Sequence, residues 1–199
     1  MDSATSSSDP HSRLPATVIR SVKILVAGHF GAGKTTLVGS VSEIPPLRTE
    51  EPITRVSIGV DDLAGLPAKK ATTVAMDFGR RTFGSTALYL FGTPGQERFA
   101  PVWDDLSRGA LGALVLVDTR RLDASFGILS AVEARGLPYA VAVNEFDDAP
   151  HHPPPEIREA LDLAPATPLI RCDARDMPSS VHALITLVAH LSQPSGAPQ

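Results

Sequence analysis

Apolar and polar residues alternate in blocks along the chain, and the blocks switch between two periods. Five short, mostly apolar runs are typical of buried strands: residues 22–27, 87–91, 113–117, 139–143 and 168–172. A sixth segment, residues 72–78, alternates apolar and polar positions as a half-buried strand does. A turn at residues 82–85 joins it to the next strand, which predicts an antiparallel hairpin.

Between the strands, apolar residues recur at helical spacing. Helices are expected at residues 34–42, at 122–135, with Asp123 near the N-cap and Gly136 closing it, at 155–161, which begins with prolines, and at 180–191. The last of these is expected to bury a face made of Val181, Leu184, Ile185 and Val188. Strands that alternate with helices predict an α/β fold, a mostly parallel sheet flanked by helices.

Residues 43–71 do not follow this alternation. They contain a weak strand pattern at residues 53–60 after a pair of prolines and a charged patch. Long irregular segments are uncommon in compact domains and are often functional. An extra edge strand is expected within this stretch.

Composition is that of one globular domain. The 199 residues are 43% apolar and 20% charged. Residues 1–17 and 193–199 lack large apolar groups and are expected to form flexible tails around a domain at 18–192. The net charge of −4 does not favour binding to nucleic acid.

Cysteine content and the chain ends bear on location. The single cysteine, Cys172, excludes an intrachain disulfide and fits a reducing cytoplasm, where it is expected to be a buried thiol. No spanning segment, signal or lipidation motif is found, so no direct membrane anchor is expected. Recruitment to a membrane would then depend on a partner.

A phosphate-binding loop follows the first strand and opens the first helix. Residues 28–35 read GHFGAGKT, which matches G-x-x-x-x-G-K-[ST] at every fixed position. In such a loop backbone N–H groups surround the phosphates, Lys34 reaches the β- and γ-phosphates, and the Thr35 hydroxyl binds Mg²⁺. The residues expected to contact nucleotide here are Gly28, Phe30, Gly31, Ala32, Gly33, Lys34, Thr35 and Thr36. The motif alone does not separate a GTPase from an ATPase or a nucleotide kinase.

Four later segments resemble the switch and base motifs of small GTPases. Residues 91–99 read FGTPGQERF, and the resemblance implies that the Gly95 amide contacts the γ-phosphate and Gln96 orients the attacking water. Residues 73–78 read TVAMDF, and the resemblance makes Thr73 the threonine that closes over Mg²⁺, with Thr72 a competing candidate.

The two base motifs lie after later strands. Residues 144–147 read NEFD and resemble N-K-x-D, which implies that Asp147 reads guanine and Asn144 ties the base loop to the phosphate loop. The carboxylate accepts from the N1–H and 2-amino groups of guanine, a donor pair that adenine lacks. Residues 172–175 read CDAR and resemble the S-A-K loop, in which Asp173 and Ala174 would lie at the base and the Ala174 N–H would meet guanine O6.

The whole stretch of residues 20–191 resembles the bacterial small GTPases of the actinomycete conservon type, related to the MglA polarity GTPases. The segments TTVAMDFGR, LYLFGTPGQERF, RGALGALVLVDTRRL and CDAR carry the resemblance. It implies a Ras-like three-layer P-loop NTPase with a six-stranded, mostly parallel sheet. It also implies a Roadblock/LC7-type regulator and a sensor-kinase-like protein as partners.

The chain departs from the family pattern at three positions. Gly92 stands where the Walker B aspartate is expected, so Mg²⁺ affinity is expected to fall unless an acid such as Asp77 substitutes. Phe30 replaces the usual glycine of the phosphate loop and would crowd Gln96, which predicts slow hydrolysis. Glu145 replaces the lysine that packs on the base and leaves adenine open as a ligand.

The predicted function is a cytoplasmic molecular switch that binds GTP and hydrolyses it to GDP and phosphate, slowly and with a partner's help. Lys34, Thr73 and Gln96 would be catalytic, and Thr35 and Thr73 would hold Mg²⁺. The alternatives are a nucleotide-binding pseudo-GTPase scaffold and a P-loop ATPase. Two other features receive simpler interpretations. Residues 118–121 end a strand near the expected nucleotide crevice and are interpreted as a solvated loop, with a functional role as the alternative. Trp103 is interpreted as a side chain packed in or next to the second switch segment.

Overall fold

The chain folds around one central sheet. The computed structural model describes residues 14–52, 73–95 and 100–193. Within them seven strands lie in the order β2-β3-β4-β1-β5-β6-β7. Their bounds are β1 (Arg20–Ala27), β2 (Leu47–Pro52), β3 (Thr73–Phe83), β4 (Thr86–Gly92), β5 (Ala110–Val117), β6 (Tyr139–Asn144) and β7 (Leu169–Cys172). The first thirteen residues, the last six and the predicted strand at 53–60 lie outside the described residues.

Strand directions agree with the predicted mostly parallel sheet. β4, β1, β5, β6 and β7 run parallel, whereas β2, β3 and β4 pair antiparallel. The six predicted strands are all present. The seventh, β2, is the edge strand expected within residues 43–71, and it pairs with β3 from Leu47 opposite Phe78 to Pro52 opposite Thr73.

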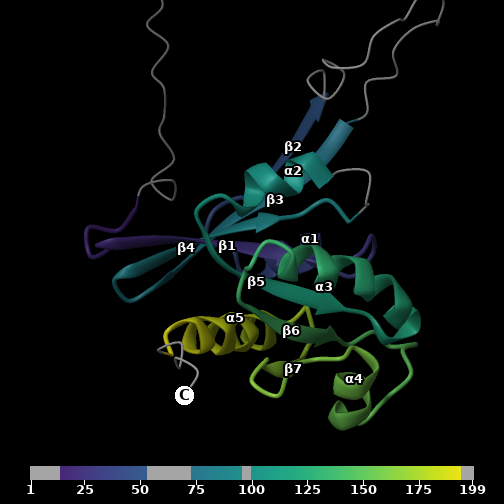
Figure 1. Ribbon diagram of the computed structural model, residues 1–199. Helices are drawn as coiled ribbons and strands as arrows, with labels where there is room; N and C mark the ends of the chain where they lie inside the picture. Colours follow the sequence, from purple (N-terminus) through teal and green to yellow (C-terminus); the bar gives the residue numbers. More distant parts are fainter. Residues whose placement is uncertain (1–13, 53–72, 96–99, 194–199) are drawn as a thin grey trace, which may run out of the picture.

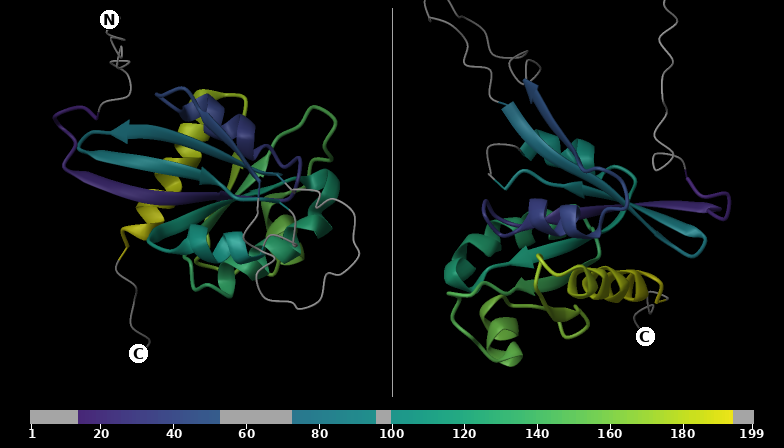
Figure 2. Two further views of the ribbon diagram at one scale, coloured as in Figure 1. Left: turned by 90° about the horizontal axis from the view of Figure 1, so that it is seen from above. Right: turned by 180° about the vertical axis from the view of Figure 1, so that it is seen from behind.

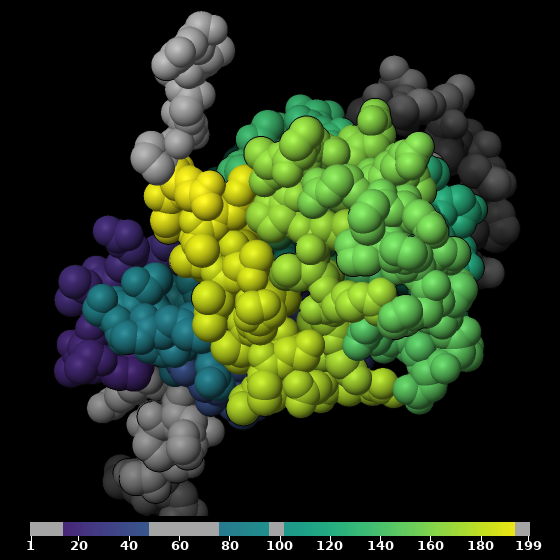
Figure 3. Space-filling model, turned by 90° about the horizontal axis from the view of Figure 1, so that it is seen from below, coloured from purple at the N-terminus to yellow at the C-terminus, as the bar shows by residue number. Residues whose placement is uncertain are grey.

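Helices cover both faces of the sheet and make the predicted three layers (Figures 1 and 2). α1 (Lys34–Val41) and α5 (Met177–Leu191) pack on one face, and α2 (Ala100–Ser107), α3 (Phe126–Glu133) and α4 (Pro154–Ala160) contribute to the core on the other. α5 forms the middle of the surface seen in Figure 3, between the β3–β4 hairpin and the segment that holds α4 and β7. No described helix is both long enough and apolar enough to cross a bilayer.

The apolar run of β1 explains why the strand lies at the centre. Ile24 and Val26 point into the core beneath α1 and α5, while Leu25 and Ala27 point into the core on the opposite face. All four are fully buried. A strand covered on both faces needs a continuous apolar run, which is the pattern that residues 22–27 show.

The helix predicted at residues 122–135 begins at a different position in the structure. A 3₁₀ helix, η3 (Thr119–Ser125), precedes α3, and it is Asp118 that caps it by accepting from the Arg120 N–H. Asp123, the predicted cap, lies inside η3. Gly136 ends the segment as predicted, with a φ of 61°.

The buried face of α5 also differs from the prediction. The helix begins three residues earlier, where the Asp176 carboxylate accepts from the Ser179 N–H. Leu184 is buried as expected, but Ile185 is 49% exposed. The fully buried positions of the helix are Ser180, Ala183, Leu184 and Leu187, and the predicted Val181 and Val188 also pack against this core, partly buried. The small side chains of Ser180 and Ala183 let α5 approach the sheet closely. Ile185 lies next to that face of the helix.

Candidate functional site

The residues that follow the parallel strands gather at one edge of the sheet. The phosphate loop follows β1, residues 93–95 follow β4, Asp118 follows β5, Asn144 ends β6 and Asp173 follows β7. Because these strands are parallel, their carboxyl ends meet at the same edge, which is where ligands bind in α/β folds.

Lys34 is held by the carbonyls of its own loop. Its Nζ donates to the carbonyl oxygens of Gly28 at 2.7 Å and His29 at 2.8 Å. Burial lowers the pKa of Lys34 to about 8, although the nearby Asp77 carboxylate works in the opposite direction. The ammonium is therefore fixed in the loop with few compensating charges, which suits the binding of an anion.

The phosphate-loop backbone needs glycine at Gly33. Its φ is 101°, and a Cβ there would collide with the Asn144 amide. The predicted tie is present: Asn144 Nδ2 donates to the Ala32 carbonyl at 3.0 Å. Asn144 Oδ1 accepts from the Ala174 N–H at 2.9 Å. The buried Asn144 side chain thus joins three loops, and the N–H that was assigned to guanine O6 is engaged by Asn144 in this structure.

The remaining loop residues line the surface of the site. Thr36 and Gly31 are exposed, and the Phe30 ring is 73% exposed beside them. His29 is buried, and its ring Nδ1–H donates to the Phe30 carbonyl at 2.7 Å. The loop therefore has a buried side, made of His29 and Ala32, and an open side on which Phe30 stands.

A carboxylate lies beside Thr35 despite the loss of the Walker B acid. The Thr35 hydroxyl donates to Asp77 Oδ2 at 2.5 Å. Asp77 comes from β3, next to Gly92 on β4, where an added Cβ would lie 3.2 Å from Asp77 Oδ2. Asp77 therefore places its carboxylate next to the position that a side chain at residue 92 would occupy.

Thr73 is not brought to this cluster. Its backbone begins β3, opposite Pro52, four residues before Asp77. At about 3.3 Å per strand residue it lies on the order of 13 Å along the strand from Asp77. Gln96 and Thr72 lie outside the described residues. The predicted metal role of Thr73 and the catalytic role of Gln96 therefore stay predictions.

Gly95 lies directly on the phosphate loop. A Cβ at this position would be 2.5 Å from the Phe30 nitrogen and 2.7 Å from the His29 carbonyl carbon, so only glycine fits. The Trp103 indole N–H donates to the neighbouring Pro94 carbonyl at 3.1 Å. Trp103 is 3% exposed and anchors the segment that follows β4, which agrees with its predicted packing.

Asp147, the carboxylate that the sequence predicts to read the base, is paired with an arginine. Arg175 donates to both Asp147 oxygens, at 3.0 and 3.1 Å. These hydrogen bonds hold the pKa of Asp147 below its usual range. Arg175 also donates to Asp173, which the sequence placed at the base. Asp147 and Asp173 thus flank one guanidinium.

An ion pair at the end of β5 is, like the pairing of Arg175 with Asp147, a feature that the sequence analysis did not predict. Asp118 is 2% exposed, so the interpretation of residues 118–121 as a solvated loop is wrong for this residue, whereas Arg120 and Arg121 are exposed. Burial alone would raise its pKa, but hydrogen bonds from Arg120 hold that pKa below its ordinary value. Arg120 also pairs with Asp148 at 2.9 Å and lies 3.7 Å from the centre of the Phe146 ring. It therefore braces residues 146–148 against β5, a tertiary link that no local motif announces.

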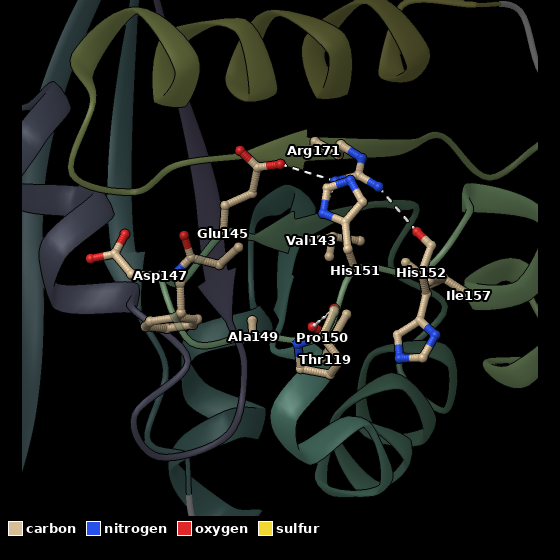
Figure 4. A pocket seen from close by; sticks show the side chains of 12 residues that line it. Thr119, Val143, Glu145, Asp147, Ala149, Pro150, His151, His152, Ile157 and Arg171 are labelled. Atoms are coloured by element: carbon tan, nitrogen blue, oxygen red, sulfur yellow. Dashed lines mark hydrogen bonds and ion pairs between the residues drawn. The ribbon is translucent and has the colours of Figure 1, made fainter.

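A pocket of about 320 Å³ lies beside the base loop, over Val143 and Ile157 (Figure 4). Arg171 from β7 donates to Glu145 at 3.1 Å and to the His152 carbonyl at 3.0 Å within it. None of residues 28–35 is among the described residues that line it. Glu145, which replaces the usual lysine, is thus drawn toward β7 by Arg171.

The chain is similar in sequence to a protein family and to individual proteins. Residues 26–194 match a family model described as "Conserved hypothetical ATP binding protein". The uncharacterized protein MJ1339 of Methanocaldococcus jannaschii is 30% identical over 133 residues, which are 63% of this chain and 71% of that protein. The Ras-related protein Rab-18-B of Danio rerio is 31% identical over 106 residues, 53% of this chain and 44% of that protein.

Solved structures share the fold. The G domain of the T. maritima FeoB iron transporter superposes with a TM-score of 0.61 at 18% identity, covering 87% of this chain and all of that domain. Identity at this level speaks for the fold alone. The Ras-like P-loop architecture predicted from the sequence is therefore confirmed.

Proposed function

Because the chain belongs to the family of conserved hypothetical ATP binding proteins and has a Ras-like fold, we propose that it is a GTP-binding molecular switch. It hydrolyses GTP to GDP and phosphate, slowly and with the help of a partner. One observation carries the choice of base: Asp147 stands on a loop that Asn144 fastens to the phosphate loop through Ala32. A carboxylate placed there accepts from the donor pair of guanine.

The phosphate end is formed by α1 and the loop before it. The loop backbone N–H groups bind the phosphates, and the buried Lys34 ammonium exchanges its carbonyl partners for phosphate oxygens. Thr35 and Asp77 offer hydroxyl and carboxylate oxygens within 2.5 Å of each other, the donor type that Mg²⁺ prefers. They would hold the ion, and Thr73, whose backbone lies on the order of 13 Å along β3 from Asp77 in this structure, would have to close over it from the first switch segment. A bound Mg²⁺ would neutralise charge on the phosphates.

Hydrolysis is proposed to be slow. Gln96 orients the attacking water in this proposal, and Gly95 offers its amide to the γ-phosphate. Phe30 supports a low rate, because its exposed ring stands on the phosphate loop, whose backbone lies against Gly95, and would crowd Gln96 or a partner's arginine. Residues 43–73 and 92–105 would change order with the γ-phosphate and be read by an effector.

The finer affiliation is to the actinomycete conservon type, related to MglA. In that setting the partners are a Roadblock/LC7-type regulator and a sensor-kinase-like protein, and the switch acts in bacterial signalling from the cytoplasm, with any membrane recruitment through a partner. The motifs at residues 73–99 and 172–175 support this affiliation. A pseudo-GTPase that binds nucleotide with little hydrolysis is the variant of the proposal that Gly92 and Phe30 favour.

ATP is the second candidate ligand. The family description names ATP. In addition, Glu145 pairs with Arg171 and is drawn away from the packing role that a lysine has beside guanine. Adenine lacks the two adjacent donors that the two oxygens of Asp147 could accept from, and guanine is therefore ranked first.

Titration of the purified protein with fluorescent GDP, GTP, ADP and ATP in the presence of Mg²⁺ tests the proposal. Guanine nucleotides are expected to bind more tightly, and Asp147→Ala is expected to weaken them about 100-fold or more. Glu159→Ala, on the exposed side of α4, is the control and should leave binding unchanged. Phosphate release over several turnovers then separates an enzyme from a pseudo-enzyme. Equal or tighter adenine binding would overturn the guanine assignment.

A further inference from the structure

The guanidinium of Arg175 makes a two-point contact with the carboxylate that is proposed to read guanine. Its NH1 donates to Asp147 Oδ2 at 3.1 Å and its NH2 donates to Asp147 Oδ1 at 3.0 Å. Both oxygens of Asp147 are thus engaged by two neighbouring N–H groups of one planar cation. Such a bidentate fork is the strongest geometry of an arginine–carboxylate pair.

Arg175 is aimed at Asp147 by a well-fastened loop. Its backbone N–H and its Nε both donate to Asp173 Oδ1, at 2.9 and 3.0 Å. The Asp173 N–H donates to the Ser179 hydroxyl at 3.0 Å, and Asp176 caps α5. The loop is therefore held by the first turn of a fifteen-residue helix. The position of the fork is set by the fold and not by chance contact of two surface chains.

The edge of guanine presents the same chemical group as Arg175. Its N1–H and 2-amino group are two adjacent donors of a guanidine unit within the ring, and they require both oxygens of Asp147. We propose that Arg175 is an affinity- and specificity-determining residue that competes with the base for Asp147. This inference rests on the proposed guanine-binding function.

Asp173 makes the exchange possible at low cost. Arg175 NH2 also donates to Asp173 Oδ2 at 2.9 Å, so the guanidinium keeps a carboxylate partner when it leaves Asp147. The side chains of Arg175 and Asp147 are 55% and 85% exposed, which allows the movement and lets water compensate. A base with two adjacent donors replaces what Asp147 loses. Adenine has no such pair, and it leaves the Arg175 fork in place.

The test compares GDP binding by the full chain and by Arg175→Met, which keeps an apolar stem but has no fork. At low ionic strength the variant is expected to bind GDP about three- to ten-fold more tightly. The gain should shrink as salt rises, because salt already weakens the competing ion pair. Arg175→Lys, a single-point donor, should fall between the two.

Arg171→Met is the matched control. It removes one positive charge from the neighbouring strand β7, where Arg171 pairs with Glu145 and not with Asp147. It should show no gain in GDP affinity. If the wild-type chain prefers GDP over ADP but Arg175→Met binds GDP no more tightly, the competition is overturned while the proposed function stands. If the wild-type chain shows no preference for GDP, the function and this inference fall together.

Discussion

At the scale of single residues, Lys34 shows how a binding site is prepared at the expense of stability. Its ammonium is buried and has two carbonyl partners, with Asp77 as the nearby charge that favours its protonated form. The folded pKa of about 8 lies below the ordinary value of 10.5. A bound phosphate would supply the missing negative charge, so the cost of burying Lys34 is recovered when nucleotide binds.

Lys34→Met is therefore expected to stabilise the nucleotide-free protein while abolishing nucleotide binding. Between pH 8 and 10.5 the unfolded chain binds more protons at Lys34 than the folded chain does, so the free energy of unfolding of the wild type rises with pH across that window. The penalty is complete below pH 8. At pH 7 the variant should gain about 1–3 kcal/mol in urea denaturation.

The control is Lys23→Met. Burial also lowers the pKa of Lys23, but its ammonium donates to the Arg108 carbonyl and lies 5.2 Å from the centre of the Phe91 ring, so its loss should stabilise the fold less than the loss of Lys34. The difference in stability between wild type and Lys34→Met should narrow from pH 8 to pH 10.5. A constant difference, or a destabilised Lys34 variant, would contradict a buried and poorly compensated cation.

Individual site residues were predictable where a local motif sets the backbone. Lys34 and Asn144 lie where their motifs place them, since the strand, loop and helix around each are local in sequence. Arg120 was missed because its partners, Asp118, Phe146 and Asp148, come together only when β5 and β6 pair. The pairing of Arg175 with Asp147 was missed for the same reason: these residues are 28 positions apart.

At the scale of elements, a polar network joins the end of α1 to β3. The Glu43 carboxylate accepts from Arg80 Nε at 2.8 Å, from the Thr82 N–H at 2.9 Å and from the Thr82 hydroxyl at 2.6 Å. Burial works against the ionised form, but these donors together hold the pKa of Glu43 below its usual value. Arg80 is only 5% exposed. The network fixes the start of the segment that leads from α1 toward β2.

Glu43→Gln is expected to lower the free energy of unfolding by about 1–3 kcal/mol at pH 7, because a neutral amide replaces the carboxylate that accepts from Arg80 Nε and from the Thr82 N–H and hydroxyl. Since the folded pKa of Glu43 is lowered, its contribution is complete above the unfolded value of 4.5 and is lost as pH falls through the folded value. Urea denaturation at pH 7 and at pH 3.5 measures this loss.

Glu159→Gln, on the exposed side of α4, serves as the comparison and should change stability little at either pH. An equal effect of the two substitutions at pH 7 would show that the Glu43 network does not fasten α1 to β3. The same conclusion would follow if Glu43→Gln lowered the free energy of unfolding by the same amount at pH 3.5 as at pH 7.

Strands and helices could be predicted from the sequence where their buried faces produce a clear apolar pattern. The central strands were found because burial on both sides demands continuous apolar runs, as in β1. The start of α3 was missed because Asp118 and Arg120 build a 3₁₀ turn that has no apolar period. Ile185 was misassigned because small residues, Ser180 and Ala183, form the contact face of α5 and carry little hydrophobic signal.

At the scale of the whole molecule, the sheet brings together three elements at the proposed metal position. Thr35 opens α1, Asp77 lies on β3 and Gly92 ends β4. The antiparallel pairing of β3 with β4 places Phe78 opposite Phe91 and so sets Asp77 beside Gly92. The carboxylate of Asp77 thus lies beside the position on the neighbouring strand where the Walker B acid is missing. The sequence raised this possibility, and the register of the hairpin supplies the geometry.

Moving the carboxylate back tests this substitution. Asp77→Gly alone is expected to lower Mg²⁺-dependent GDP affinity about 10- to 100-fold, since it removes the acid beside Thr35. Gly92→Asp alone should not restore a normal site, because its Cβ would lie 3.1 Å from that of Asp77 and two carboxylates would crowd each other. The double variant, Asp77→Gly with Gly92→Asp, should recover most of the affinity.

The readout is GDP affinity with Mg²⁺ and with EDTA, measured for all four proteins together with their thermal unfolding. If the double variant recovers GDP affinity in Mg²⁺ but not in EDTA, Mg²⁺-dependent binding requires a carboxylate near Thr35, whichever of the two strands carries it. If Asp77→Gly lowers affinity equally with and without Mg²⁺, Asp77 acts on the nucleotide or on the fold. In that case the metal role passes to residues outside this cluster, because Thr35 would be the one residue of Thr35, Asp77 and Gly92 that still offers a side-chain oxygen.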